Sequence, residues 1–584
     1  MALDTSPPPA QKESSGPHPA LEDPVTEDAS PTTGRVDKVV FGVTAALAVG
    51  FLVWGFASTA SLGSASSSAL SWTVTNMGWL FVTLASAFVV FVIWLAAGRF
   101  GNIPLGNDDE EPEFRTVSWI AMMFSAGMGI GLMFYGVSEP LTHFVTPPPG
   151  TVSAGSPQAV QTAMATTLFH WTLHPWAIYA VVGLAVAYGV FRKGRRQLIS
   201  ATFIPLIGER RAKGGLGRVI DILAIFATLF GSAASLGLGA LQIGSGLQIV
   251  SGIGKIGNGV LVGVIVLLTI AFIGSAVSGV EKGIQWLSNI NMVLALVLAV
   301  FVFVVGPTVF MLDLVPTAIG SYFQNLAAMS ARTDASGGDG MAKWLSGWTV
   351  FYWAWWLSWT PFVGMFIARI SRGRTIRQFV TGVLLVPSLV SLVWFAIFGG
   401  AAIKLQQGGV DLAGASSVEG QLFGMLGHLP LATITSVLVM VLVAIFFVSG
   451  ADAASIVMGS LSEGGALEPS KKTVIFWGVA TGGVAAVMLL VGGDSALTGL
   501  QNITIVAALP FALVMIGLAV ALVKDLRNDP LMVRRRYARE AIEQAVVTGV
   551  TLHGDDFALT VEPADESVLS GGDTTPSRSA DIAR

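Results

Sequence analysis

The sequence contains no cysteine, and only 12% of its 584 residues are charged. The absence of cysteine excludes disulfides, thiolate nucleophiles, cysteine-ligated zinc and iron–sulfur centres. A soluble domain carries roughly a quarter charged residues, so an ordinary cytosolic globule is excluded too. Because the first apolar run lacks a preceding basic segment and a cleavage pattern, we expect no signal peptide.

Long apolar runs make up most of the sequence between its two tails. Hydrophobic residues make up 53% of the chain, and continuous runs of about 18 residues or more recur from Val39 to about Lys524. Strands of a membrane barrel would alternate apolar and polar residues, so we predict an all-α integral membrane protein. About twelve transmembrane helices are expected, at 39–57, 77–97, 117–138, 160–191, 219–250, 259–276, 285–312, 344–371, 379–400, 431–462, 473–490 and 502–524.

The two ends of the chain differ from its apolar centre. Residues 1–36 are rich in proline and serine, which predicts a disordered N-terminal tail. In the C-terminal tail, 525–584, the stretch from Arg534 to Gln544 is typical of a helix. Two β-prone runs follow, 546–552 and 557–561, on either side of His553–Asp556, and they predict a β-hairpin.

Lysine and arginine concentrate in alternate loops. The segment 192–218 alone holds eight of them, whereas the loops of opposite sidedness hold only Lys255, Arg332, Lys343 and Lys404. By the positive-inside rule, this asymmetry predicts a multi-pass protein with both termini cytoplasmic. We expect it in a bacterial-type cell membrane. All basic residues can be assigned to loops, tails or span ends, so a voltage sensor is not expected.

Two predicted spans carry signs of interruption. The third contains Gly127, Gly129 and Gly131, and the eighth contains Pro361 and Gly364 within an aromatic stretch. Freed backbone groups at membrane depth are tolerated where they face protein, water or substrate, and paired broken helices indicate the binding site of a secondary transporter. Each break opens a set of five spans, 117–312 and 344–524. Tight helix packing is the alternative for the glycines.

Aromatic residues lie deep inside two spans. Trp171, Trp176 and Tyr179 can share one face of the fourth helix, and Trp355, Trp356 and Trp359 one face of the eighth. Interfacial tryptophans belong at helix ends, so these residues fit an aromatic belt poorly. Indole and phenol rings attract quaternary ammonium groups by cation–π interaction. An uncharged aromatic box of this kind favours a zwitterion.

Three long motifs together resemble the betaine/carnitine/choline transporter family, from about Val39 to Asp529. They are Gly127–Met128–Gly129–Ile130–Gly131, His170–Trp171 through Trp176 and Tyr179, and Phe351 through Gly364. The resemblance implies a homotrimer with a 5+5 inverted repeat, the leucine-transporter-like fold, after two extra N-terminal helices at 37–98. It implies an ammonium box of Trp171, Trp176, Tyr179 and Trp356. It assigns the substrate carboxylate to Trp359 and the backbone of Gly127, Gly129 and Gly131, and the path or gates to Phe351, Trp353 and Trp355.

The same resemblance implies sodium as coupling ion, with no other cofactor. One site would use Thr228 and Ser232 beside the Phe362 ring, although these hydroxyls could instead bond back to their own helix. A second site would use Ser125 and Met128, whose carbonyls would serve as ligands, with Phe446 and Ser449. The hydroxyl pair expected there reads Ser449–Gly450, so one oxygen ligand is missing.

Other candidates are weaker. Asp452 is an intramembrane carboxylate that either functions in transport or caps a break near Gly450. His170 and His174 have the spacing of a metal pair, but structural hydrogen bonding is favoured. Arg372, Arg374 and Arg377 are expected to meet lipid headgroups or the cytoplasmic tail.

These observations predict a sodium-coupled symporter of a zwitterionic osmolyte, most of all glycine betaine, with ectoine or proline as further substrates. Gly131 supports a zwitterion, because choline carriers resemble the pattern with Asp there. A sodium-independent carnitine or betaine exchanger is the alternative within transport, and an osmotically gated channel or sensor is the alternative from another class. We expect no enzyme, since the sequence offers no nucleophile–base or metal cluster, and we expect substrate and lipid as partners but no nucleic acid.

Overall fold

The computed structural model describes residues 35–127, 129–254, 256–278, 281–415 and 417–560. Within these ranges the protein is all-helical, apart from one isolated β-bridge between Pro104 and Thr375. The predicted all-α class is therefore confirmed for the described residues, while most of the N-terminal tail lies outside them. The chain divides into a helical body that ends at Leu526 and a C-terminal tail from Arg527.

Nine stretches of the described chain are long and apolar enough to cross a membrane, and a bent helix pair raises this number to ten. Seven of the nine are the single helices α1 (Lys38–Ala57), α2 (Thr59–Ala97), α9 (Gly215–Ser251), α15 (Ile376–Gln407), α18 (Ala432–Ser462), α19 (Lys471–Gly492) and α20 (Ala496–Arg527). The others are α10 (Asn258–Ser278) and the consecutive α5 (Pro157–Trp171) and α6 (Leu173–Ala187). The bent pair is α11 (Glu281–Val305) with α12 (Thr308–Ser330), which meet at 109°.

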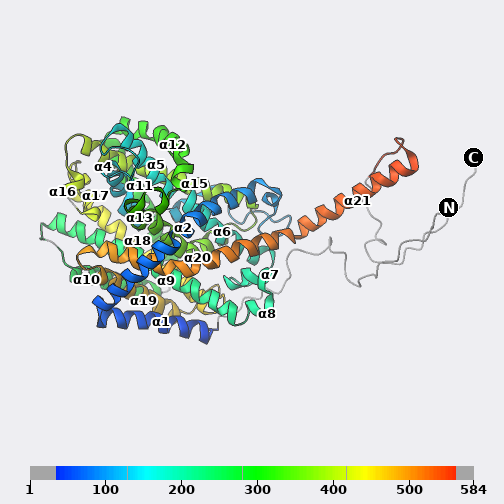
Figure 1. Cartoon of the computed structure of the whole chain (residues 1–584). Coiled ribbons are helices and arrows are strands. Elements are labelled where there is room, and N and C mark those ends of the chain that lie inside the picture. Colours follow the sequence, from blue (N-terminus) through cyan, green and yellow to red (C-terminus); the bar gives the residue numbers. More distant parts are fainter. Residues whose placement is uncertain (1–34, 128, 255, 279–280, 416, 561–584) are drawn as a thin grey trace, which may run out of the picture. The chain divides into compact units, whose positions relative to one another are not determined.

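A second group of helices is shorter, broken or more polar. It comprises α3 (Thr116–Gly127), α4 (Ile130–Val145), α13 (Gly338–Gly347), α14 (Thr349–Arg369) and α17 (Gln421–Gly427), with the one-turn helices α7 (Ile204–Ile207), α8 (Glu209–Ala212) and α16 (Leu412–Ala415). Figure 1 shows the helices of the body. Within it, α14 packs against α6 and α9, and α4 packs against α15. Almost every residue of α14 is buried, which makes this aromatic helix the core element of the bundle.

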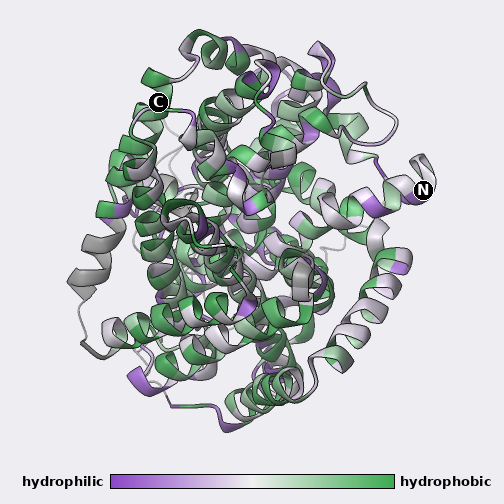
Figure 2. Cartoon of the chain, turned by 90° about the vertical axis from the view of Figure 1, so that its left-hand side faces the viewer, coloured by the Kyte–Doolittle hydropathy of each residue, from purple (hydrophilic) through white to green (hydrophobic). Residues whose placement is uncertain are grey.

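The outward faces of many helices in the body are apolar. Figure 2 shows hydrophobic residues on the outer helices as well as inside the bundle. Leu267, Val304 and Val90 are 66%, 67% and 69% exposed. Water would oppose such exposure, whereas lipid tails favour it, so the exposed apolar faces agree with a multi-pass membrane protein.

The predicted break in the third span is confirmed, but the one in the eighth is wrong. Between α3 and α4, Gly129 adopts an extended backbone with φ −174° and ψ −179°. In contrast, α14 is continuous through Pro361. The carbonyl of Leu357 loses its usual amide donor at Pro361, and the Thr360 hydroxyl donates to it instead at 2.6 Å. The actual break lies earlier, at Trp348, between α13 and α14.

The seventh predicted span also differs from the structure. We expected one helix over 285–312, but α11 ends at Val305 and α12 leaves at a sharp angle after Gly306 and Pro307. The segment expected as an outward loop is therefore largely helical. Proline cannot continue a helix without losing a hydrogen bond, which accounts for the position of the bend.

The predicted β-hairpin in the tail is wrong. Helix α21 (Pro530–His553) covers the whole first strand, 546–552, and ends at Gly554, whose φ is +63°. Phe557 then lies against Gly549, where a Cβ atom would approach its ring to 2.4 Å. Once a helix has a capped start at Asp529, each further residue costs little, and β-branched residues reduce this only slightly. Val561 of the second strand lies outside the described residues.

Candidate functional site

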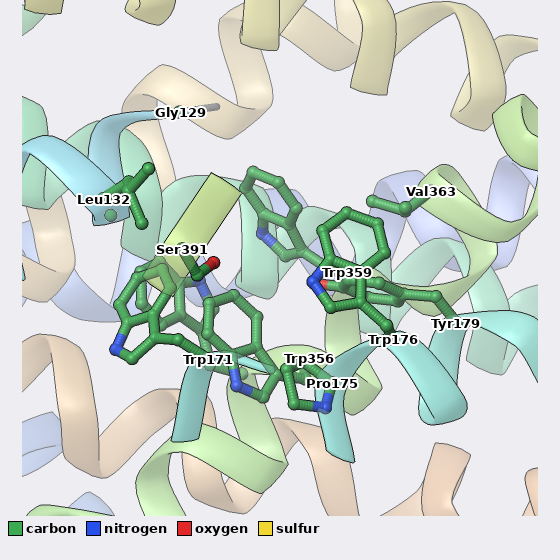
Figure 3. A pocket seen from close by; sticks show the side chains of 12 residues that line it. Gly129, Leu132, Trp171, Pro175, Trp176, Tyr179, Trp356, Trp359, Val363 and Ser391 are labelled. Carbon is green, nitrogen blue, oxygen red and sulfur yellow. The ribbon is translucent and has the colours of Figure 1, made fainter. Parts of the chain in front are cut away.

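A cavity inside the body is enclosed by aromatic side chains from three helices. Trp171 lies at the end of α5, Trp176 and Tyr179 on α6, and Trp356 on α14 (Figure 3). The remaining lining residues are Gly129, Gly131, Leu132, Pro175, Trp355, Trp359, Val363 and Ser391. The structure thus brings the predicted box residues into one cavity, which we call the aromatic box.

The rings of the aromatic box stand at steep angles to one another. Trp171 and Trp356 have centroids 4.9 Å apart with planes at 74°, and Trp176 and Tyr179 have centroids 5.4 Å apart at 76°. Tyr179 lies 6.2 Å from Trp356 at 78°. Rings arranged edge to face leave several π faces open to a common space, which is the geometry that holds a quaternary ammonium group.

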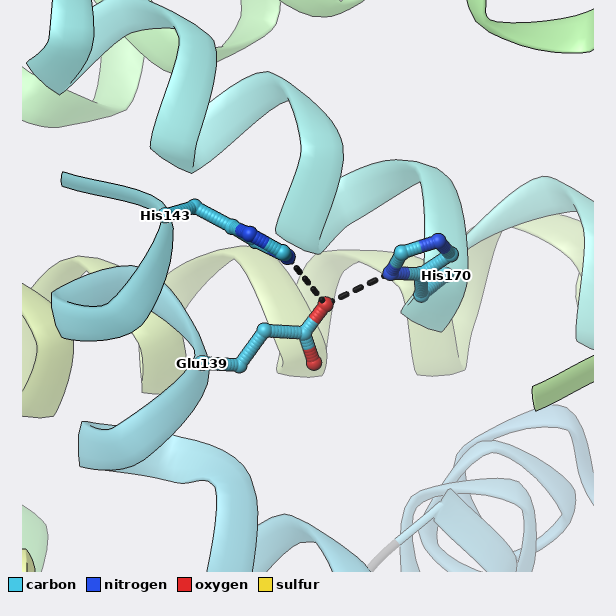
Figure 4. Close-up of side chains that lie close together, drawn as sticks. All are labelled: Glu139, His143 and His170. Carbon is cyan, nitrogen blue, oxygen red and sulfur yellow. Dashed lines mark hydrogen bonds and ion pairs between the residues drawn. The ribbon is translucent and has the colours of Figure 1, made fainter. Parts of the chain in front are cut away.

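The buried carboxylate of Glu139 accepts hydrogen bonds from two aromatic side chains, Trp171 and Tyr352. Glu139 of α4 is fully buried, and its Oε2 accepts hydrogen bonds from the Trp171 indole at 2.7 Å and from the Tyr352 hydroxyl. Its Oε1 is bonded to Nδ1 of His170 at 2.6 Å (Figure 4). The Trp356 indole donates to the backbone carbonyl of His170 at 3.0 Å. Glu139 therefore connects two walls of the aromatic box.

Glu139, His143 and His170 also form the kind of group that can hold a metal. Their ligand atoms lie within 4.8 Å of one another, and Nε2 of His143 is 3.5 Å from Glu139 Oε1 (Figure 4). The carboxylate is already engaged by three hydrogen bonds to protein groups, so we assign this cluster a structural role. His170 and His174 do not pair; His174 contacts Ser86 at 3.3 Å instead.

Gly131 is required by the close approach of two rings. A Cβ atom there would lie 2.6 Å from the Trp355 ring and 2.9 Å from the Trp171 ring. At Gly129 an added Cβ would contact none of the described residues, so we assign its role to the extended backbone between α3 and α4. Gly127 is the last residue of α3, and its surroundings are not described.

The predicted gate residues separate into two groups. Trp355 lines the aromatic box and stacks on Trp356, with centroids 4.7 Å apart at 14°. Phe351 stacks behind Trp355, at 5.5 Å and 19°. Trp353 is fully buried against His174, at 5.0 Å and 19°, and does not line the aromatic box.

A second cavity adjoins the aromatic box and contains several predicted sodium ligands. Among its lining residues are Ser232 on α9, Phe362 on α14 and Phe446, Ser449 and Gly450 on α18. It shares Gly129, Trp359 and Val363 with the aromatic box. We call it the second cavity; its volume is about 210 Å³, against about 50 Å³ for the aromatic box.

Other predicted sodium ligands are placed differently or not described. The Thr228 hydroxyl donates to Ala224 O in its own helix at 2.8 Å, as the alternative interpretation expected. The side chain of Ser125 is not described, and Met128 lies outside the described residues. Asp452 does not line the second cavity but accepts a bond from Ser275 at 3.4 Å.

Sequence reasoning missed several residues at or near these cavities. It assigned no role to Glu139 or His143, and it overlooked Asn291, which lines the second cavity. A polar residue within a long apolar run was the available signal for Asn291. Glu139 offered a similar signal, but its partners His170 and Tyr352 lie on other helices and follow from no local pattern.

The fold and cavities define a polytopic helical membrane protein with an enclosed aromatic cavity. Residues 39–531 match the profile of the betaine/carnitine/choline family transporters. The chain is 50% identical over 555 residues to the betaine/ectoine transporter LcoP of Corynebacterium glutamicum, covering 95% of this chain and 88% of that protein. It is 45% identical over 491 residues to the glycine betaine transporter OpuD of Bacillus subtilis, covering 84% and 94%. The chain belongs to the betaine/carnitine/choline transporter family.

Proposed function

We propose that this protein is a sodium-coupled symporter that accumulates a zwitterionic osmolyte across a bacterial cell membrane. Glycine betaine is the expected main substrate, and ectoine and proline are further candidates. The aromatic box carries this proposal, because four rings surround a space that suits a quaternary ammonium head. The names of the relatives, a betaine/ectoine transporter and a glycine betaine transporter, support the same class of substrate.

The uncharged lining of both cavities favours a zwitterion over a cation. None of the described residues that line them is Asp, Glu, Lys or Arg. A net-neutral substrate can enter such a space without an unbalanced buried charge. The Trp359 indole NH is buried, has no hydrogen-bond partner among the described residues, and lines both cavities. We assign it, with the backbone around Gly129, to the substrate carboxylate.

Sodium coupling is supported by oxygen atoms without fixed charge around the second cavity. The hydroxyls of Ser232 and Ser449 line it, with the rings of Phe362 and Phe446 beside them. Sodium is a hard cation that prefers such oxygen ligands. Thr228 would have to keep its bond to Ala224 and offer a lone pair, since a hydroxyl can donate and accept at once.

The architecture expected from the family completes the proposal. We assign 117–312 and 344–524 to two inverted five-helix repeats, preceded by two additional helices, in a homotrimer with cytoplasmic termini. The break between α3 and α4 and the break before α14 lie near the start of each repeat, which supports this division. The basic segment 192–218 supports the orientation.

Uptake by purified protein in proteoliposomes tests the function. Radiolabelled betaine, ectoine, proline, carnitine and choline are compared with and without an inward sodium gradient. We expect betaine to accumulate above its external concentration only with the gradient. Equilibration without accumulation would indicate a channel, and uptake that requires internal substrate rather than sodium would indicate an exchanger. The exchanger is the second candidate because Gly450 removes a hydroxyl from the expected sodium site.

A single substitution tests the site. Trp356→Ala removes one wall of the aromatic box and should raise KM for betaine about fivefold or more, because a desolvated cation–π contact contributes about 1–2 kcal/mol. Trp356→Phe should have a smaller effect. Trp72→Ala is the control, since Trp72 is 54% exposed on α2. A KM unchanged in Trp356→Ala would place the substrate elsewhere.

A further inference from the structure

The second cavity contains a polar side chain that the proposed function leaves unused. Asn291 on α11 is only 1% exposed, and both its Oδ1 and its Nδ2 lack a hydrogen-bond partner among the described residues. It lines the second cavity, and none of the other described lining residues carries a charge. A buried amide without partners is costly, and such a group is retained where a ligand or an ordered water completes its hydrogen bonds.

The remaining walls of the second cavity offer two kinds of surface. Rings of Trp359, Phe362, Phe366 and Phe446 provide π faces, and the hydroxyls of Ser232 and Ser449 are neutral hydrogen-bonding groups. A quaternary ammonium carboxylate needs both surfaces, one for its cationic head and one for its carboxylate. A cavity that is mostly apolar with a few convergent polar groups is typical of small-molecule sites.

The two cavities adjoin one another. Trp359, Val363 and Gly129 line both, and the buried indole NH of Trp359 has no hydrogen-bond partner in the described part of the chain. The second cavity is also the roomier, at about 210 Å³ against about 50 Å³. A zwitterion that leaves the aromatic box past Trp359 therefore reaches the larger second cavity. There the Asn291 amide offers a hydrogen-bond donor that no described residue uses.

We propose that the second cavity is a separate station for the zwitterion on its path, where the Asn291 carboxamide holds the substrate carboxylate. This inference rests on the proposed function. At this station the carboxylate would lie beside the hydroxyls assigned to sodium, so the two charges would attract one another in a space of low dielectric. Ion and substrate would then stabilise each other directly.

Substitution of Asn291 tests the station. Asn291→Leu keeps the size of the side chain and removes both hydrogen-bonding atoms. Because a hydrogen bond to a charged carboxylate is lost, we expect the maximal rate of betaine uptake to fall about tenfold. The betaine Kd of the purified protein, measured by tryptophan fluorescence, should stay within about twofold of the parent, since the aromatic box is untouched. Asn291→Asp should be slower still, because its carboxylate repels that of the substrate.

The control is Asn325→Leu, since Asn325 lies exposed on α12 and bonds only back to its own helix, to Ser321 O at 2.8 Å. It should transport like the parent. A parent-like rate in Asn291→Leu overturns the station, as does a Kd weakened as much as the rate, which would make Asn291 part of the first site. A shift confined to the sodium titration would make Asn291 an ion ligand and also overturn it.

Two further measurements distinguish failure of the proposed station from misfolding of a variant and from failure of the proposed function. If Asn291→Leu fails on detergent sizing, Asn291→Ser replaces it as the variant without a carboxamide and should be about as slow as expected for Asn291→Leu. Asn291→Gln retains the amide and should keep at least half of the parent rate. A well-folded Gln variant as slow as Asn291→Ser would contradict the carboxamide role. If the parent itself takes up no betaine, the proposed function fails, whatever the variants do.

Discussion

At the scale of single residues, the site depends on a carboxylate that does not touch the cavity. Glu139 is absent from the lining of the aromatic box, yet it accepts hydrogen bonds from Trp171 and Tyr352 and is bonded to His170. Glu139 holds the Trp171 indole directly and the Trp356 indole through His170. Both indoles must keep their orientation for the rings to face the same cavity. Glu139 is thus a positioning residue.

Replacing Glu139 should weaken substrate binding more than it slows transport. Glu139→Leu leaves the Trp171 indole and His170 without their acceptor, which costs on the order of 1–3 kcal/mol per buried group, so KM for betaine should rise about tenfold or more. Glu139→Gln keeps one acceptor oxygen and should be intermediate. Glu468→Gln, at an exposed position, is the control. Equal KM values in the Leu variant and the parent, by radiolabelled uptake, would show that the network does not position the box.

Gly131 allows charge and bulk to be separated. Because a Cβ would lie 2.6 Å from the Trp355 ring, Gly131→Ala should displace that wall and raise KM for betaine severalfold without admitting choline. Gly131→Asp adds the same Cβ atom and, beyond it, a carboxylate that balances a pure cation, so its choline-to-betaine uptake ratio should rise above that of Gly131→Ala. Identical ratios in the two variants would make Gly131 a packing residue alone.

The residues of the aromatic box were predictable from the sequence, whereas their support was not. Trp176 and Tyr179 share one face of α6, as the 3.6-residue period predicts. Trp171 instead ends α5, before a break at Thr172 that the expected single helix over 160–191 did not include. The partner of Glu139, His170, lies 31 residues away on another helix. Asn291 forms no hydrogen bond among the described residues, so no pairing pattern marked it.

At the scale of helices, composition located the elements better than their interruptions. Pro361 suggested a break that does not occur, because Thr360 supplies a hydroxyl to the carbonyl that the proline leaves unpaired. The true interruption at Trp348 carries no proline or glycine of its own; Gly347 precedes it at the end of α13. Tertiary packing around α14, which is buried along almost its whole length, therefore outweighs local signals there.

The start of α1 gives a prediction with a defined pH dependence. Asp37 caps this helix by accepting from Val39 N at 2.9 Å and binds Arg218 at 2.9 Å. Burial raises the pKa of Asp37, but the bonds from Arg218, Val40 and Val39 and the guanidinium charge outweigh it and place the pKa below the ordinary value. A lowered pKa means that the stabilisation is present above the ordinary pKa of about 3.9 and is lost as pH falls through the folded-state value.

Two substitutions of Asp37 separate its cap from its charge. Asparagine caps as well as aspartate, so Asp37→Asn should lose only the ion pair, at most about 1 kcal/mol. Asp37→Ala should lose the cap too, about 1 kcal/mol more. By thermal unfolding in detergent, the Tm difference between Asp37→Asn and the parent should shrink from pH 7 to pH values below about 4. A difference that is constant over this range would exclude a role for the Asp37 charge.

At the scale of the whole molecule, the membrane class and the family followed from the sequence, as did the helix over Arg534–Gln544, but the structure of the tail beyond Gln544 did not. Val546, Val547 and Val550 suggested strands, although an isolated two-stranded hairpin is at best marginally stable in water. The helix that forms instead has 24 residues and is therefore about 36 Å long. Its basic residues, Arg534, Arg535, Arg536 and Arg539, all lie in its first ten positions.

This long, basic helix predicts that the tail makes transport sensitive to its surroundings. Clustered arginines attract anionic lipid by about 1 kcal/mol each near the surface, an attraction that ionic strength screens. Truncation after Asn528 should leave basal betaine uptake within about twofold and abolish any increase with osmolality in proteoliposomes rich in anionic lipid. Replacing Arg534, Arg535 and Arg536 by Gln should reproduce this loss, whereas truncation after His553, which keeps α21 whole, should not. If the first truncation follows the parent over a full osmolality titration at every lipid composition, α21 has no part in regulation, because the only basic cluster of the tail would then be dispensable.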